Sequence, residues 1–308
     1  MSYTTILGNK KSWQWLNVIK PDQKDHQTLS KKFQFTADDL DDAFKSTLRS
    51  KIVNRGKYIF FVALVPFYDQ KTNKVNVSEI DIFMGDDFLI TISNGKIEAL
   101  KTIFAKYQAV KFYSSIKQVD ELFFKIIDTI LENIYPLIDT INDTLEKIKQ
   151  HIFAGNNARA TSHNILITRR NITDMRKALR GYGALLNNLT RYAQTSNYAF
   201  SPDLKKFEEL AEDAQEIWAV LESHKEMVEA LKDSNESLIS HNLNAVMKTL
   251  TIFSVILLPA GVVAGIFGMN AENIPVIGKP LDFWILLGII CSVSLFLLFI
   301  FWRKRWLR

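Results

Sequence analysis

Two long uncharged apolar runs near the C-terminal end constrain the fold of this chain most. The first extends from Thr249 to Asn270 and is about 21 residues long, and the second, Phe283 to Trp302, follows after a loop of about a dozen residues. A helix of about 20 apolar residues crosses the hydrocarbon core of a bilayer. We therefore expect a multi-pass membrane protein, with a first span that ends at 268, a loop over 269–282 and a second span over 283–302.

The charges around these runs predict their orientation. The formal net charge is +5, and part of it comes from the tail 303–308, which holds Arg303, Lys304, Arg305 and Arg308. Lys and Arg beside membrane spans stay on the cytoplasmic side, and Lys248, just before the first run, agrees. We expect a protein of the cell (inner, cytoplasmic) membrane with both termini cytoplasmic. The tail is interpreted as a topology signal, and no nucleic-acid partner is expected.

Several chemistries are not expected from this sequence. The single cysteine, Cys291, lies in the second run, which suits a body kept in a reducing compartment. The sequence holds no phosphate-binding loop and no supported nucleophile–base pair, so neither ATP-driven pumping nor an enzyme is expected, and no organic cofactor is expected. Zinc-site spacing is also missing, and most of the histidines are expected at the surface: His26, His151, His163, His224 and His241.

The first 114 residues are expected to form a mixed α/β domain. Thr36 is expected to cap a helix, and Gly85 to lie in a hairpin turn. A further helix is expected over about Lys96–Tyr107. The predicted strands are rich in β-branched and aromatic residues and cover Lys51–Arg55, Tyr58–Pro66, Val75–Met84 and Phe88–Ser93.

Residues 115–200 are expected to form a helical hairpin. Its two helices are predicted over Ile116–Phe153 and Ala158–Ser196, with a break near Gly155. Ser201-Pro202-Asp203 then predicts a helix start, because serine caps and proline is tolerated in the first turn. From there a stalk helix over 201–268 is predicted to continue into the first membrane span. About 65 residues at 1.5 Å each would extend roughly 100 Å, which indicates a coiled stalk.

Two stripes with 3-4 spacing follow this stalk. The first predicts packing against neighbouring helices and contains Leu204, Phe207, Ala211, Ala214, Trp218 and Leu221. The second begins at Asp233, Ser237 and Ser240 and continues into the membrane, where its members are mainly small or polar. Small residues suit close helix packing, whereas hydroxyl and amide groups suit a water-filled pore. Both interpretations remain open from the residues alone.

Gly268-Met269-Asn270 stands at the outer end of the first span, before a short loop, a second span and a basic tail. In this order the tripeptide resembles the signature of the CorA family of magnesium transporters. The likeness extends over nearly the whole chain, because YIFFVALVPFYD and EIDIFMGDDFLITIS resemble strands of that family's cytoplasmic domain.

The resemblance implies a funnel-shaped homopentamer in a lipid bilayer, an α+β membrane protein whose five first spans line a channel. Gly268, Met269 and Asn270 would form the selectivity filter. The pore-lining positions would be Asn244, Met247, Thr251, Ser254, Leu258, Gly261 and Gly265. The partners would be divalent cations, with Mg²⁺ both transported down its gradient and regulatory.

Three acids are candidates for binding these cations. The resemblance implies that Asp233 lies at the cytoplasmic mouth and that Glu209 helps to bind a regulatory ion between subunits. Glu272, in the outer loop, would concentrate cations by its field. A solvated surface acid without a role is the competing interpretation of Glu272.

The sequence also departs from the family pattern. Ile274-Pro275-Val276 replaces a run that commonly carries an acid, Lys279 adds a positive charge, and Gly261 replaces a common threonine. A Co²⁺, Ni²⁺ or Zn²⁺ transporter of the same family therefore remains an alternative. A membrane-anchored scaffold that does not conduct is the rival from another class.

Overall fold

The computed structural model describes residues 3–7, 13–109, 118–155, 157–195, 204–269 and 281–304. The chain divides into two compact units, Met1–Asp233 and Ser234–Arg308. The long helix α8 (Leu204–Phe267) belongs partly to each. The two units are described separately below.

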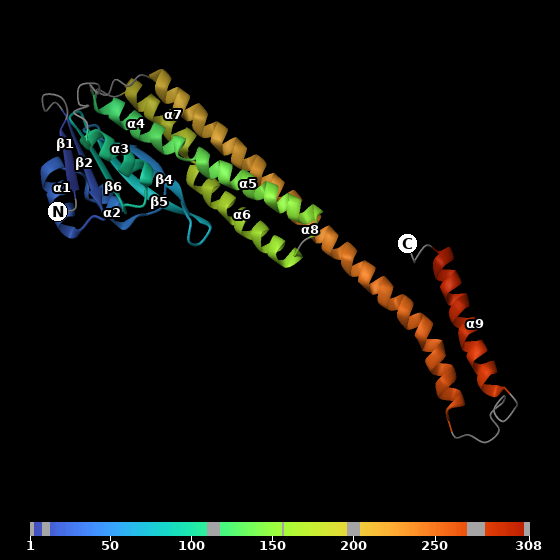
Figure 1. Cartoon of the computed structure of the whole chain (residues 1–308). Coiled ribbons are helices and arrows are strands. Elements are labelled where there is room, and N and C mark those ends of the chain that lie inside the picture. The colour runs from blue at the N-terminus through green and yellow to red at the C-terminus, as the bar shows by residue number, and fades with distance from the viewer. Residues whose placement is uncertain are drawn as a thin grey trace. The chain divides into compact units, whose positions relative to one another are not determined.

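A six-stranded sheet forms the centre of the first unit, in the order β1-β2-β6-β5-β4-β3 (Figure 1). Its strands are β1 (Tyr3–Leu7), β2 (Gln14–Ile19), β3 (Lys51–Asn54), β4 (Ile59–Asp69), β5 (Lys74–Met84) and β6 (Phe88–Ser93). All neighbouring pairs are antiparallel except β2 and β6, which are parallel. The fold is therefore a mixed α/β domain at its N-terminal end, as the sequence predicts.

Helices cover both faces of this sheet. On one face, α1 (Gln23–Phe33) and α2 (Ala37–Lys45) contribute Leu29 and Leu40 to a core with Phe60 and Phe83. On the other face, Phe61 and Ile82 join a larger core that includes residues of α3 (Glu98–Ala109) and α4 (Val119–Glu132). Most of β4 and β5 is consequently buried on both faces, which explains the nearly continuous apolar sequence of β4.

The predicted hairpin at Gly85 joins β5 to β6. Glycine is required here because any side chain would collide with a neighbouring aromatic ring. The backbone N–H of Gly85 donates to the Phe88 carbonyl over 2.8 Å. A Cβ at this position would lie 2.2 Å from the Phe88 ring. The glycine therefore makes room for an aromatic side chain of the core.

An ion pair between the buried Asp39 carboxylate and the exposed Arg55 guanidinium ties α2 to the sheet. Asp39 is 1% exposed and receives two hydrogen bonds from the Arg55 guanidinium, each of 2.8 Å, and a third of 2.8 Å from the Tyr58 hydroxyl. Burial raises the pKa of Asp39, but the hydrogen bonds from Arg55, Tyr58 and Thr36 outweigh it, so that this pKa lies below its usual value. Thr36 caps α2 as the sequence predicts.

Arg55→Ala is expected to destabilise the protein, because it leaves the Asp39 carboxylate buried without its charged partner. The loss should be about 2–3 kcal/mol, the range for hydrogen bonds to a charged group. Chemical unfolding of the full-length protein would measure it. Lys57→Ala, which removes an exposed charge two residues away, is the control and should change little; equal effects of the two substitutions would contradict the role of the ion pair.

Four helices take the place of the two predicted over residues 115–200. They are α4 (Val119–Glu132), α5 (Tyr135–Phe153), α6 (Ala158–Leu179) and α7 (Tyr182–Thr195). The first break precedes Pro136, which lies in the first turn of α5. Proline has no backbone N–H, and its ring would clash with the carbonyl of residue 132 if the helix continued through it. The second falls at Gly181, where a Cβ would lie 3.5 Å from Ser50.

The N-terminal half of α8 is held by an apolar seam, and the seam differs from the predicted stripe. Leu210 and Ile217 belong to it, whereas Trp218 is half-buried and lies beside Arg176. The buried positions Phe207, Leu210, Ala214, Ile217, Leu221, His224 and Val228 follow the spacing of a coiled-coil repeat. Ala211 of the predicted stripe is buried as well. The predicted start Ser201-Pro202-Asp203 lies outside the described residues.

Two ion pairs fix α8 against α6. Arg176 pairs with Glu222, and Arg169 pairs with Glu229 over 2.6 Å. The residue numbers rise along α8 as they fall along α6, so the two helices are antiparallel. The turn between α5 and α6 therefore lies at the end of the first unit toward which α8 runs.

Two histidines depart from the expected surface position: His26 is half-buried and His224 is buried. His224 is 9% exposed, and its Nδ1 atom is buried without a hydrogen-bond partner. Burial lowers the pKa of His224, because the imidazolium form would lose its hydration. The seam thus holds a neutral imidazole.

Acidification is expected to weaken this seam. The pKa of His224 is lower in the folded chain than in the unfolded chain. The stability that the neutral ring contributes is therefore complete above the pKa of the unfolded chain, and it is lost as the pH falls toward the pKa of the folded chain. His224→Leu should keep the thermal midpoint higher by about a few degrees in acid. Thermal scans of full-length protein from about pH 7.5 to about pH 5 would show this. The matched control is His163→Leu on the surface of α6; an equal gain there would contradict the assignment.

Candidate ion pathway

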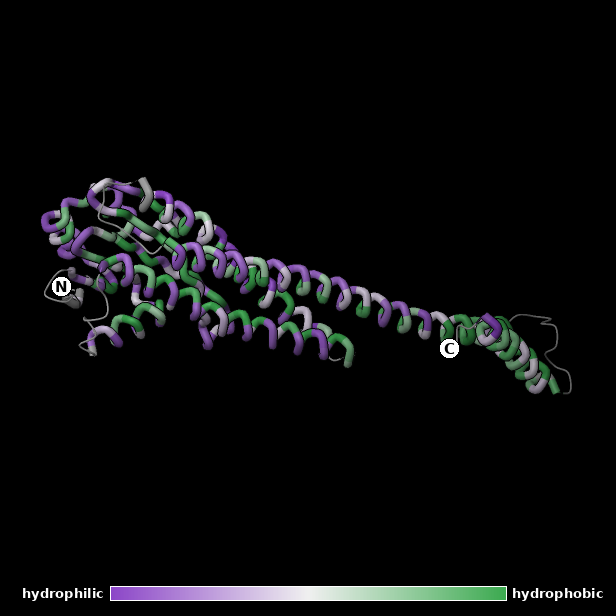
Figure 2. The backbone as a smooth tube through the Cα atoms, turned by 90° about the horizontal axis from the view of Figure 1, so that it is seen from above, coloured by the Kyte–Doolittle hydropathy of each residue, from purple (hydrophilic) through white to green (hydrophobic). Residues whose placement is uncertain are grey.

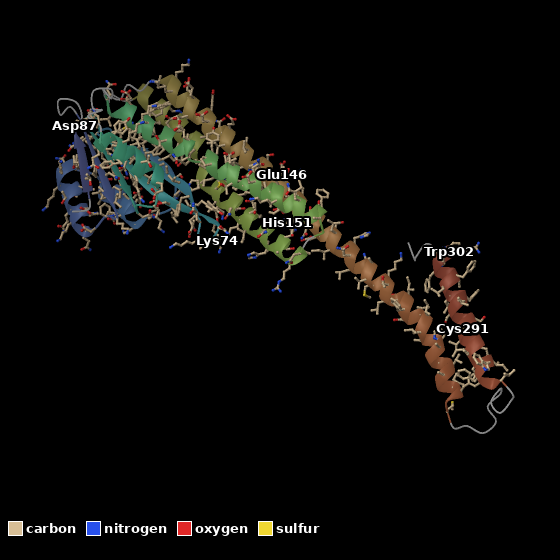
Figure 3. All side chains as sticks on the ribbon, in the orientation of Figure 1. Lys74, Asp87, Glu146, His151, Cys291 and Trp302 are labelled. Atoms are coloured by element: carbon tan, nitrogen blue, oxygen red, sulfur yellow. The ribbon has the colours of Figure 1, made fainter. Side chains whose placement is uncertain are left out.

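The second unit consists of the C-terminal part of α8 and helix α9 (Asp282–Arg303). Both helices are long and apolar enough to cross a membrane. Figure 2 shows the change along α8 from mixed to hydrophobic residues, and the mainly hydrophobic character of α9. These are the two transmembrane helices that the sequence predicts. Cys291 lies exposed on α9 (Figure 3).

One face of the membrane part of α8 is half-buried. Ile252, Ile256, Pro259 and Val263 lie on it, and α9 has a matching row at Leu286, Ile290, Ser294 and Leu297. Since this unit contains only these two helices among the described residues, each helix covers the other. Ile252, Ile256, Pro259 and Val263 recur at intervals of three and four residues, which keeps them on one face of the helix.

The candidate pore-lining residues lie away from this half-buried face of α8. All of them are exposed; Met247 is 59% and Leu258 68% exposed. They are Asn244, Met247, Thr251, Ser254, Leu258, Gly261 and Gly265. No described residue of the second unit covers this stripe, so it is open to water, lipid or another chain.

Small and polar residues along the stripe leave hydroxyl oxygens and backbone groups exposed. The Thr251 hydroxyl donates to the Met247 carbonyl over 2.8 Å, which leaves its oxygen lone pairs directed outward from that bond. A Cβ added to Gly261 or Gly265 would meet nothing within 4 Å, so these two glycines leave open space beside the backbone. Pro259 lacks an N–H, so the carbonyl four residues earlier has no helical donor. A helix of this kind can present polar groups along one line.

The signature residues close α8. The Gly268 N–H donates to the Ala264 carbonyl over 2.9 Å, and a Cβ on Gly268 would lie 2.8 Å from that same oxygen. A side chain at this position would therefore disturb the last turn. Met269 is 55% exposed. Asn270 and Glu272 lie outside the described residues.

Asp233 and Glu209 are both exposed on α8. The Asp233 carboxylate lies 3.9 Å from Lys232 Nζ, and its side chain is 76% exposed. The two acids are 24 residues apart on one helix (233 − 209), or about 36 Å at 1.5 Å per residue. Within the described part of one chain, they therefore do not meet, and no group of three His, Cys, Asp or Glu is placed to hold a metal.

Comparison with known proteins decides the family. The family described as CorA-like Mg²⁺ transporter protein matches residues 10–305. The chain belongs to the CorA family. This is a family of membrane transporters of divalent cations, not of enzymes.

Relatives of the CorA family cover almost the whole chain. The protein YfjQ of Bacillus subtilis is 26% identical over 96% of this chain and 90% of its own length. The cobalt/magnesium transport protein CorA of Methanocaldococcus jannaschii is 22% identical over 95% of this chain and 91% of its own. The structure titled as the complete CorA magnesium transporter from that archaeon has a TM-score of 0.82, 21% identity, and coverage of 98% of this chain and 93% of that one.

A second solved structure has the same fold. Full-length CmaX has a TM-score of 0.78 at 19% identity and covers 96% of this chain and 89% of that one. The order of an N-terminal α/β domain, a long helix and two C-terminal membrane helices is therefore the CorA fold. The fold predicted from the sequence is confirmed.

Proposed function

We propose that this protein is a channel-like pathway through which divalent cations, chiefly Mg²⁺, enter the cell down their electrochemical gradient. The observation that carries the proposal is the exposed stripe on α8. One face of its membrane part, at Ile256 and Val263, is half-buried, whereas the stripe that bears Asn244, Thr251 and Ser254 is exposed. In a homopentamer, five such faces can surround one axis.

The chemistry of the stripe suits a hydrated ion. Mg²⁺ loses its coordinated water reluctantly, so hydroxyl, amide and carbonyl oxygens that accept hydrogen bonds from those waters are adequate ligands. In the proposed filter at Gly268, Met269 and Asn270, the Asn270 amide oxygens act in this way. A ring of amides binds the ion less tightly than a ring of carboxylates would. Conduction requires this, because the ion must leave the filter as well as enter it.

The membrane potential supplies the driving force in this proposal. Both termini lie in the cytoplasm, on the basis of the cationic residues at Lys248 and in the tail. An inside-negative potential favours entry of a divalent ion by about 4–5 kcal/mol per 100 mV. No coupled energy source is required, and Glu272 at the outer mouth raises the local concentration of cations.

Cytosolic cations close the pathway in this proposal. Asp233 and Glu209 are exposed and do not form a site within one chain, which suits sites completed by a neighbouring copy. A bound Mg²⁺ neutralises acids that otherwise repel each other, and loss of the ion lets the stalks separate. The proposed regulation is negative feedback on uptake.

Flux through proteoliposomes tests the filter. Asn270→Ala should reduce Mg²⁺ flux about tenfold or more, because it removes the acceptor amide from every subunit of the ring. Asn273→Ala, which removes another amide from the same loop, is the matched control. Undiminished flux in the Asn270 variant would reject the filter, and Co²⁺, Ni²⁺ or Zn²⁺ moving faster than Mg²⁺ would reject the proposed ion. The absence of any flux through a folded oligomer would favour the scaffold.

Regulation is tested separately by internal Mg²⁺. Asp233→Ala should leave a larger share of flux at high internal Mg²⁺, because the closing ion loses a ligand. Glu236→Ala, an exposed acid three residues away and off the stripe, should retain the native dependence. A native dependence in both variants would remove Asp233 from the gate.

A further inference from the structure

A cavity of ≈290 Å³ lies in the first unit between α5, α6 and the hairpin that joins β4 to β5. Its walls come from three separate segments of the chain. Asn171 of α6 fixes the arrangement: its Oδ1 accepts from the Val75 N–H over 2.9 Å, and its Nδ2 donates to the Asn73 carbonyl over 3.1 Å. The hairpin is thereby held against α6, and the cavity is a built feature of the fold.

The cavity wall carries a positive charge at Lys147. Lys147 and His151 line it from successive turns of α5, and residues four apart lie on the same helix face. Figure 3 labels His151 on α5, beside α6. No Asp or Glu is found among the described residues that line the cavity. The wall therefore favours an anion over a cation.

The polar groups that the fold itself needs are already paired. The Tyr68 hydroxyl donates to Asn73 Oδ1 over 3.2 Å, and the Thr144 and Thr168 hydroxyls donate to carbonyls of their own helices. By contrast, the Lys147 ammonium, the His151 ring and the Asn164 side-chain amide make no hydrogen bond or ion pair with the described protein groups. These three donors come from both helices and remain for a ligand.

The rest of the wall is apolar. Leu137, Ile141, Ile148 and Ile167 line the cavity together with Val75. Ligand sites commonly combine an apolar wall with a few polar groups that fix orientation, and their volumes begin near 300 Å³. This cavity is therefore at the small end of that range, and it can hold an apolar group as large as one aromatic ring.

We propose that this cavity binds a small organic phosphate. Its phosphate group lies against Lys147, His151 and Asn164, and its apolar group lies between α5 and α6. Lys and amide N–H groups are suitable phosphate donors. The site is separate from the ion pathway and goes beyond the proposed transport function, since none of its lining residues belongs to α8 or α9.

Calorimetric titration of the full-length protein in detergent, with empty micelles as blank, tests the site. Phenyl phosphate carries both parts of the proposed ligand, phenol has only the ring, and inorganic phosphate has only the anion. Phenyl phosphate should bind at least about tenfold more tightly than either, because each of the other two lacks one set of contacts.

Variants locate the binding. Lys147→Ala and Asn164→Ala should each weaken phenyl phosphate binding, by about tenfold for the lysine, since a hydrogen bond to a charged group is lost. Lys149→Ala is the matched control, because this lysine lies on α5, pairs with Glu146 over 3.1 Å and does not line the cavity. Circular dichroism would show that each variant is folded.

Three results would overturn the proposal: no saturable binding of phenyl phosphate, equal binding of phenol, or an equal loss in the Lys149 variant. The second would indicate apolar partition, and the third diffuse attraction to a basic surface. Asn270→Ala protein should bind phenyl phosphate as the native protein does. Failure of the transport proposal and failure of this site are therefore distinguishable.

Discussion

The packing of α8 through its apolar seam is the constraint on which the rest of the structure depends. Phe207, Ala214, Leu221 and Val228 recur every seven residues and are buried against the first unit. The same seam brings α8 against α6, where Arg176 pairs with Glu222 and Arg169 pairs with Glu229. In the second unit, α8 has a half-buried face of its own at Ile256 and Val263, and the polar stripe lies away from that face.

The polar side chains of the first unit fall into two groups: some hold elements of the fold together, and others make no hydrogen bond or ion pair with the described protein groups. Asp39 with Arg55, and Asn171 with the β4–β5 hairpin, are fully used in holding elements together. Lys147, His151 and the Asn164 side chain make no such contact. These three residues are exposed at the rim of the cavity, so their donors are open to water and to a ligand.

Some of these features could be predicted from sequence because their physical causes are local. The bilayer requires about 20 apolar residues in succession, and Gly268-Met269-Asn270 stands at the end of such a run. The β5–β6 hairpin is equally local. The parallel partner of β2 lies far along the chain, and the burial of His224, Leu210 and Ile217 depends on which helices surround α8. No periodicity within α8 distinguishes these residues from Trp218. The cavity cannot be predicted from local sequence patterns either, because its walls come from three separate segments of the chain.

The parallel pairing of β2 with β6 sets an order of assembly. Trp15 donates to the Thr91 hydroxyl, 76 residues away, whereas β3 to β6 are joined by short connections. Local hairpins close quickly, and distant pairings bear a larger loop-closure cost. During synthesis, the strands made first must therefore wait for β6 before they can join the sheet. β1, which pairs only with β2, joins with it, so the N-terminus of the newly made chain is among the last parts of the domain to become protected from proteases.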